Sequence, residues 1–253
     1  MTGARIRTAG LTLRYPNRSV LQGVDFSMEP GELVAILGPS GAGKSSFLRT
    51  VAGLVRPSSG TVLVDDQPVA GPHADVALAF QDPCLLPWLS VERNVAFGLT
   101  FARQPHLSRA SRKERVTLAL REVALEHSRT WTPSQLSGGM AQRAALARCL
   151  ARQPRALLLD EPFGALDEVT RADMQQLLVK VVRHTGASTL IVTHDIDEAL
   201  LVADRILLLG NNGTVVDEWT VDVPAPRAPH IQKLGEMRIQ ILRALQNSMS
   251  RAA

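Results

Sequence analysis

The chain has 253 residues, of which 45% are hydrophobic and 21% are charged, and its formal net charge is +4. These values are typical of a folded protein with one large domain, or with a core that carries a small inserted subdomain. The small basic excess does not by itself indicate nucleic-acid binding. Cys84 and Cys149, the only cysteines, lack metal-ligand spacing and argue against a disulfide framework.

No apolar run approaches the roughly 20 residues that a membrane-spanning helix needs. Residues 1–12 also lack the apolar stretch of a secretory signal. We therefore expect a cytoplasmic protein, in which any membrane role comes through a partner.

In chain order, residues 6–26 alternate short β-like runs with turns. Residues 33–37 form a continuous apolar run, as in a strand buried on both faces, and lead through glycines into a helix predicted over 45–54. Further short strands are predicted at 62–64 and 77–80.

The character of the sequence changes over residues 85–155, which predict a helical insertion. Residues 108–128 indicate a polar, basic helix whose apolar stripe contains Val116, Leu120 and Val123. A helix of small residues follows at 141–151.

Alternation of strand and helix returns after the insertion. Buried strands are predicted at 156–159 and 189–193, separated by an amphipathic helix over 170–185, and this pattern indicates a parallel α/β core. A proline-punctuated stretch follows at 219–229. The last helix is expected to dock on its own domain rather than on a partner, through a stripe formed by Ile231, Leu234, Met237, Ile241 and Leu245.

A phosphate-binding loop lies between the strand at 33–37 and the next helix. Its pattern G-x-x-x-x-G-K-S is formed by Gly38, Pro39, Ser40, Gly41, Ala42, Gly43, Lys44 and Ser45. The glycines allow backbone N–H groups to converge on phosphate oxygens at a helix N-terminus. Lys44 is expected to bridge the β- and γ-phosphates, and the Ser45 hydroxyl is expected to coordinate Mg²⁺.

Other polar residues follow predicted strands at the same edge of the sheet. Asp160 and Glu161 end one strand, so that one carboxylate can hold Mg²⁺ while the other polarises the attacking water. His194 ends another strand, and Gln81 follows the run 77–80. Because ligands bind at the carboxyl ends of strands in open α/β sheets, we expect all of these side chains to face one crevice with Gly38.

The segment Leu136-Ser137-Gly138-Gly139-Met140 opens the helix of small residues shortly before the strand that ends in Asp160 and Glu161. A phosphate loop combined with this LSGG helix start resembles the ABC ATPases. The resemblance covers about residues 5–245. Met140 departs from the commoner pattern, which has Gln, but the anion-binding Ser137 and the two glycines remain, so nucleotide recognition is expected to survive.

The resemblance assigns roles to individual residues. Tyr15 would stack on adenine, and Gly38 to Ser45 with Ser46 would form the Walker A loop. Gln81 would be the Q-loop glutamine, which contacts metal or water. Asp160 would be the Walker B aspartate, Glu161 the general base, and His194 the switch histidine. Ser137, Gly138 and Gly139 would be the signature, and Asp167 of Ala165-Leu166-Asp167 would form the D-loop.

The implied fold class is α/β, a P-loop NTPase (RecA-like) parallel-sheet core with an N-terminal antiparallel β subdomain and an inserted α-helical subdomain. An ABC ATP-binding domain would occupy residues 5–230, with the helical subdomain at about 85–155, and a C-terminal helix and tail would occupy 231–253. ATP and Mg²⁺ are the implied cofactors. Since the chain has one phosphate loop and one signature, the resemblance implies a head-to-tail homodimer that closes on ATP.

The chain resembles the nitrate/sulfonate/taurine importer group in three segments, residues 80–89, 94–98 and 161–167. Residues 170–175 look closest to the taurine and aliphatic sulfonate systems of that group. The implied partners are two membrane permease subunits and, indirectly, a periplasmic solute-binding protein. The chain would be peripheral, on the cytoplasmic face of the inner membrane. The segment 85–88 would either dock a permease or pack within the helical insertion.

Three alternatives to sulfonate import are considered. Nitrate or another small solute could replace a sulfonate as the imported substance. A soluble ABC ATPase acting on nucleic acid is disfavoured, because only 90 residues separate Ser45 from Leu136 and the chain has a single cassette; we expect no nucleic-acid partner. Glu161 and His194 together argue against a nucleotide-binding regulator without turnover.

Overall fold

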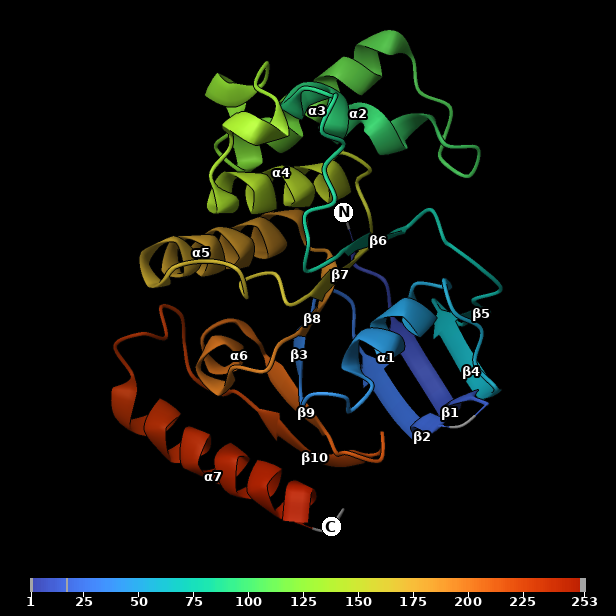
Figure 1. The fold of residues 1–253 in the computed structure, drawn as a ribbon, viewed down its shortest axis with the longest axis vertical. Helices are drawn as coiled ribbons and strands as arrows, with labels where there is room; N and C mark the ends of the chain where they lie inside the picture. Colours follow the sequence, from blue (N-terminus) through green and yellow to red (C-terminus); the bar gives the residue numbers. More distant parts are fainter. Residues whose placement is uncertain (1, 17, 251–253) are drawn as a thin grey trace.

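A computed structural model of the chain describes residues 2–16 and 18–250. It contains two sheets with helices packed around them, and the chain runs from the small antiparallel sheet through the larger parallel one to a long C-terminal helix (Figure 1). Among the described residues, none of the helices combines the length and the apolar character needed to cross a bilayer.

The smaller sheet is antiparallel and comes from the N-terminal part of the chain. Its strand order is β2-β1-β4-β5. These strands are β1 (Ile6–Tyr15), β2 (Arg18–Met28), β4 (Ser59–Val64) and β5 (Gln67–Pro68). The short strand predicted at 62–64 is therefore the end of β4.

The larger sheet has the order β10-β9-β3-β8-β7-β6, and it is parallel except for β10. Its strands are β3 (Leu33–Leu37), β6 (Val76–Ala79), β7 (Ala156–Asp160), β8 (Ser188–Val192), β9 (Arg205–Leu209) and β10 (Val215–Thr220). The neighbours β3, β8 and β7 place three of the predicted site strands side by side.

Most of the helices between β6 and β7 are short. They are α2 (Val91–Ala96), η1 (Phe97–Thr100), α3 (Arg109–Glu122), η2 (Glu126–Ser128), η3 (Pro133–Gln135) and α4 (Gly138–Leu150). The remaining helices are α1 (Lys44–Val51), α5 (Glu168–Thr185), α6 (Ile196–Val202) and α7 (Ile231–Ser250).

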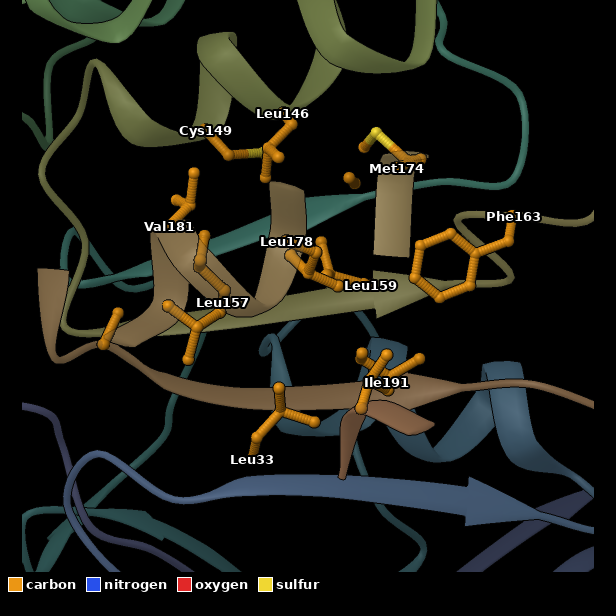
Figure 2. Close-up of a cluster of buried hydrophobic side chains, with 14 of the residues drawn as sticks. Leu33, Leu146, Cys149, Leu157, Leu159, Phe163, Met174, Leu178, Val181 and Ile191 are labelled. Carbon is orange, nitrogen blue, oxygen red and sulfur yellow. The ribbon is translucent and has the colours of Figure 1, made fainter. Parts of the chain in front are cut away.

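The buried strands of the larger sheet divide the core between the two faces of the sheet. Leu33, Leu157 and Leu159 belong to one hydrophobic cluster with α4 and α5, whereas Val34 and Leu158 belong to another cluster with α1 and the small sheet. This alternation follows from the period of two in a strand. Figure 2 shows the first cluster, in which side chains of α4 and α5 meet those of β7 and β8.

The predicted helix over 108–128 is two elements. α3 ends at Glu122, and Ala124 follows with a φ of 56°, before the separate turn η2 begins. A left-handed non-glycine residue cannot continue a right-handed helix, so the chain turns there. The predicted stripe itself is confirmed, since Val116, Leu120 and Val123 are all buried.

The sequence patterns did not predict α6, β9 or β10. They also assigned Ile231 wrongly to the buried stripe of the last helix. Ile231 is 78% exposed at the start of α7, whereas Ile241 is fully buried against the core. α7 contacts α6 and β10. Residues 251–253 of the predicted tail lie outside the described residues.

Candidate functional site

The phosphate loop begins where β3 ends and continues into α1. Gly43 precedes α1 with a φ of 94°, and a Cβ there would lie 2.6 Å from the carbonyl oxygen of Val20. Only glycine fits both the backbone conformation and the close approach. The Ala42 amide donates to the Pro39 carbonyl at 3.2 Å, which closes the turn of the loop.

Lys44 lies inside this loop and is mostly buried. Its Nζ donates to the carbonyl oxygens of Gly38 at 2.7 Å and Pro39 at 3.0 Å. Burial lowers the pKa of Lys44, and the nearby Glu161 and Asp160 carboxylates oppose this shift. The ammonium group is thus held over the loop, where phosphate oxygens would be bound.

Ser45 and Asp160 join the phosphate loop to β7. Ser45 Oγ donates to Asp160 Oδ1 at 2.8 Å. Burial raises the pKa of the Asp160 carboxyl, and the hydrogen bond from Ser45 opposes the shift. A hydroxyl and a carboxylate oxygen at this distance are hard donors, which suits Mg²⁺.

Glu161 lies between two of the predicted site residues. Its Oε2 accepts from Gln81 Nε2 at 3.3 Å and lies 3.4 Å from His194 Nδ1. The backbone of Glu161 has a φ of 45°, and its amide donates to the Val192 carbonyl at 2.9 Å. The strand therefore ends in a left-handed turn that directs the carboxylate toward Gln81 and His194.

Tyr15 lies at the end of β1, paired with Arg18 of β2, and its side chain is 49% exposed. The Arg18 guanidinium donates to the Gly41 carbonyl at 2.8 Å, so this hairpin is attached to the phosphate loop. Tyr15 is therefore available at the surface rather than packed in the core. The sequence reasoning did not identify Arg18.

Three further residues of the predicted phosphate loop, and Ser46 after it, lie between β3 and the first turn of α1. Ser40 and Gly41 are exposed in the loop and Ala42 is buried under it. Ser46 lies in the first turn of α1, where its carbonyl accepts from Thr50 Oγ1 at 2.8 Å.

The signature residues lie elsewhere. Ser137 caps α4, its Oγ accepting from the Met140 amide at 3.3 Å, and Gly138 and Gly139 form the first turn of that helix. α4 packs on the face of the larger sheet opposite to α1 (Figure 1). In the part of the chain that the structure describes, no hydrogen bond or ion pair joins these residues to the phosphate loop.

Asp167 lies beside the signature, at the start of α5. Its Oδ1 accepts from the Thr170 amide at 3.1 Å. Hydrogen bonding with Thr170 lowers the pKa of the Asp167 carboxyl. A Cβ on Gly139 would lie 2.3 Å from Thr170 Cγ2, so the two helix starts touch. The D-loop and the signature thus form one surface, separate from the loop around Lys44.

Gln142 and Arg148 of α4 are functional candidates that the sequence reasoning missed. Gln142 is buried and its Nε2 donates to the Gln81 carbonyl at 2.7 Å. Arg148 donates to the carbonyls of Pro83 and Cys84, both at 2.7 Å. A buried glutamine in a helix of small residues was the available signal. Through these bonds, the helix that begins at the signature holds the segment that carries Gln81.

Comparison with known proteins gives a consistent assignment. The family described as ABC transporter matches residues 21–164. The chain is 44% identical over 247 residues to the aliphatic sulfonates import ATP-binding protein SsuB 1 of Xanthomonas axonopodis pv. citri (strain 306), with 96% of each chain covered. It is 47% identical over 230 residues to SsuB of Mycobacterium avium (strain 104), with 88% of this chain and 86% of that protein covered.

Two solved structures share the fold. The dimeric ATP-binding cassette MJ0796, in a post-hydrolysis state bound to ADP and Pi, matches with a TM-score of 0.76 and 33% identity over 85% of this chain and 98% of that one. CbiO1 of Clostridium perfringens, part of the ABC transporter complex cbiONQ, matches with a TM-score of 0.79 and 28% identity over 98% of both chains. These matches agree with the P-loop architecture and the geometry of the site, so the chain belongs to the ABC transporter family and is an ATPase of that family.

Proposed function

We propose that this chain is the ATP-hydrolysing subunit of an importer for a small organic anion, with an aliphatic sulfonate or taurine as the imported substance. The observation that carries the catalytic part is the position of the Glu161 carboxylate between Gln81 and His194, beside the Ser45–Asp160 pair. Relatives that are named aliphatic sulfonates import ATP-binding proteins support this choice of imported substance.

Within this proposal, each group has one task. Lys44 and the amides of the phosphate loop bind the phosphates, and Ser45, Asp160 and Gln81 provide oxygen ligands for Mg²⁺, which neutralises phosphate charge when bound. Glu161 accepts a proton from the attacking water, and His194 Nδ1 orients the Glu161 carboxylate. Tyr15 stacks on the adenine ring.

The separation of the two surfaces supports a homodimer. Ser137, Gly138 and Gly139 lie on the opposite side of the sheet from α1, so a single chain does not enclose a nucleotide between its own phosphate loop and its own signature. A second copy arranged head to tail supplies the missing half and excludes water from the γ-phosphate. The dimeric cassette among the solved relatives is consistent with this arrangement.

The permease contact is proposed at the segment that follows Gln81. Trp88 is 73% exposed there, while Leu85 packs against the core of the helical region. Because Gln142 and Arg148 of α4 hold this segment, a change at the signature can reach the permease through one rigid helix. Two permease subunits at the cytoplasmic face of the membrane, served by a periplasmic solute-binding protein, complete the proposed complex.

Substitution of Glu161 by Gln tests the enzymatic part. The amide keeps the size of the carboxylate but cannot accept a proton, so turnover is expected to fall about 10²- to 10⁴-fold while the ATP-bound dimer becomes long-lived. Normal hydrolysis by a folded Glu161→Gln protein would remove Glu161 from the role of general base.

Growth of a deletion strain tests the imported substance. Loss of the gene should abolish growth on taurine or an alkanesulfonate as the only sulfur source, and growth on sulfate should be unaffected. The parent gene, but not the Glu161→Gln gene, should restore it. Retained growth on sulfonates together with loss of nitrate uptake would favour the nitrate alternative.

A further inference from the structure

Glu198 is a buried carboxylate that the proposed reaction does not use. It lies in the first turn of α6, four residues after His194, and only 6% of it is exposed. Burial raises the pKa of Glu198, and the hydrogen bond from Thr193 opposes the shift. A buried carboxylate is costly unless it is paired and hydrogen-bonded, so its contacts indicate what it stabilises.

One oxygen of Glu198 holds the backbone around His194. Thr193 Oγ1 donates to Glu198 Oε2 at 2.6 Å and accepts from the Asp195 amide at 3.1 Å. Residues on both sides of His194 are therefore attached to one hydroxyl, and that hydroxyl is attached to Glu198. The Thr193 amide donates to the carbonyl of Ile36 in β3 at 3.2 Å, which places His194 at the end of the sheet.

The other oxygen of Glu198 faces the D-loop. Arg171 Nε lies 3.4 Å from Glu198 Oε1, and the same guanidinium donates to the Leu166 carbonyl at 2.9 Å. Leu166 directly precedes Asp167, and its Cδ2 lies 3.9 Å from the place of a Cβ on Gly138. The Arg171–Glu198 pair therefore joins the D-loop, which contacts the signature, to the segment that carries His194.

We propose that Glu198 and Arg171 are positioning residues, which act together to fix His194 in its place against Glu161 according to the position of the D-loop. The pair does not touch nucleotide. It couples the position of the surface formed by the signature and the D-loop to the position of His194 beside Glu161. His194 is then held against Glu161 only when the D-loop is in the position that pairs Arg171 with Glu198. This inference depends on the roles proposed for Glu161 and His194.

The test compares Glu198→Gln, Arg171→Met and the double variant in the full-length protein. Glu198→Gln removes the charge that holds Arg171 and keeps the side-chain volume. Its kcat for ATP is expected to fall about 10- to 100-fold, as for a small misplacement of a reacting group, while KM stays within about twofold. Arg171→Met should behave alike, and the double variant should lose no more than the worse single variant.

A second measurement does not depend on turnover. The chain has six histidines, and the imidazole NMR signal of His194 is assigned by its absence in a His194→Gln protein. That signal should shift in both Glu198→Gln and Arg171→Met. Arg171→Lys should recover part of kcat, because a lysine keeps a positive charge near Glu198 but lacks the planar guanidinium that also donates to the Leu166 carbonyl.

Asp197→Asn is the matched control. Asp197 is the neighbouring residue of α6 and forms an exposed ion pair with Arg238 of α7 at 3.0 Å. Its substitution should change neither kcat nor the His194 signal, as expected for a surface pair.

Three results would overturn the proposal: a folded Glu198→Gln protein with a kcat within about twofold of the parent, an unshifted His194 signal, or losses that add in the double variant. If Glu198→Gln does not fold, Arg171→Met alone decides the question with the same measurements. Normal turnover in Glu161→Gln would instead reject the proposed general base, so the two failures are distinguishable.

Discussion

Ser45 and Asp160 lie 115 residues apart in the chain, yet the Ser45 hydroxyl donates to the Asp160 carboxylate at 2.8 Å. This contact joins the end of the phosphate loop to the end of β7 and fixes the place proposed for Mg²⁺. It also leaves a carboxylate with 6% exposure at a site that must accept a cation. Such a carboxylate costs stability in exchange for function.

Substitution of Asp160 by Asn is therefore expected to stabilise the nucleotide-free protein. The amide oxygen still accepts from Ser45, and the buried charge is gone. We expect a gain of about 1 kcal/mol, or about 2–4 °C in Tm for a chain of this size. Thermal unfolding without nucleotide measures the gain, and Mg²⁺-dependent ATP turnover should be lost in the same variant.

The pH dependence of this gain has a definite sign. Burial raises the pKa of Asp160 in the folded protein, so the parent gains stability as the pH falls through that raised pKa. The advantage of Asp160→Asn should therefore be largest near neutral pH and should vanish below the ordinary value of 3.8. An advantage that grows on acidification would contradict the role assigned to burial.

The proposed head-to-tail dimer predicts that two inactive variants complement each other. Lys44→Ala removes the ammonium group of the phosphate loop and should weaken ATP binding. Gly138→Asp adds a negative charge at the signature, and its side chain has room, since the nearest atom to a Cβ there is 3.9 Å away. An aspartate in the first turn of α4 also suits the helix dipole, so the fold should persist.

In the Glu161→Gln background, neither variant alone should retain ATP through gel filtration. A mixture should retain one ATP per heterodimer, because one chain then contributes an intact phosphate loop and the other an intact signature. Retention by either variant alone would contradict the composite site. The Asp197→Asn change, at an exposed ion pair between α6 and α7 that lies outside the phosphate loop and the signature, offers a control that should behave as the parent does.

The convergence of Gly38, Asp160 and His194 could be predicted, because each follows an apolar strand and parallel strands share one edge. In the structure, the strands that lead to these residues, β3, β8 and β7, are neighbours in the sheet. The pair Arg171–Glu198 could not be predicted. Its two members lie on different helices, and only the packing of α5 against α6 brings them within 3.4 Å.

Gln142 shows the same limit. A glutamine at a buried helical position signals a polar contact, but its acceptor, the Gln81 carbonyl, lies in a loop 61 residues earlier. Ile231 shows the reverse case. Its spacing fits the stripe of α7, yet helix periodicity does not tell where along a helix the contact with the domain begins. The roles of the individual site residues stay predictions that the variants described here address.

The two cysteines should differ in reactivity. Cys84 is exposed, whereas Cys149 is buried on α4, and burial raises the pKa of the Cys149 thiol. A thiol reagent should modify one group in the native protein and two after unfolding. Cys84→Ser should abolish the native reaction, and modification of Cys149 in that folded variant would contradict the packing of α4 against the sheet.

The contact between Gly139 and Thr170 predicts a steric effect that a second substitution relieves. A Cβ at Gly139 would lie 2.3 Å from Thr170 Cγ2, so Gly139→Ala should destabilise the protein by about 1–3 kcal/mol. Thr170→Ser removes Cγ2, and the double variant should therefore recover most of the lost Tm.

Gly138→Ala is the matched control, because the nearest atom is 3.9 Å from its Cβ. The stability of this variant should be equal to or above that of the parent. If Gly138→Ala and Gly139→Ala lowered Tm equally, or if Thr170→Ser gave no recovery, the signature would not be packed on the start of α5. With that packing, movement of the signature is coupled to movement of the D-loop, so that in the proposed dimer the two approach the second chain's nucleotide as one surface.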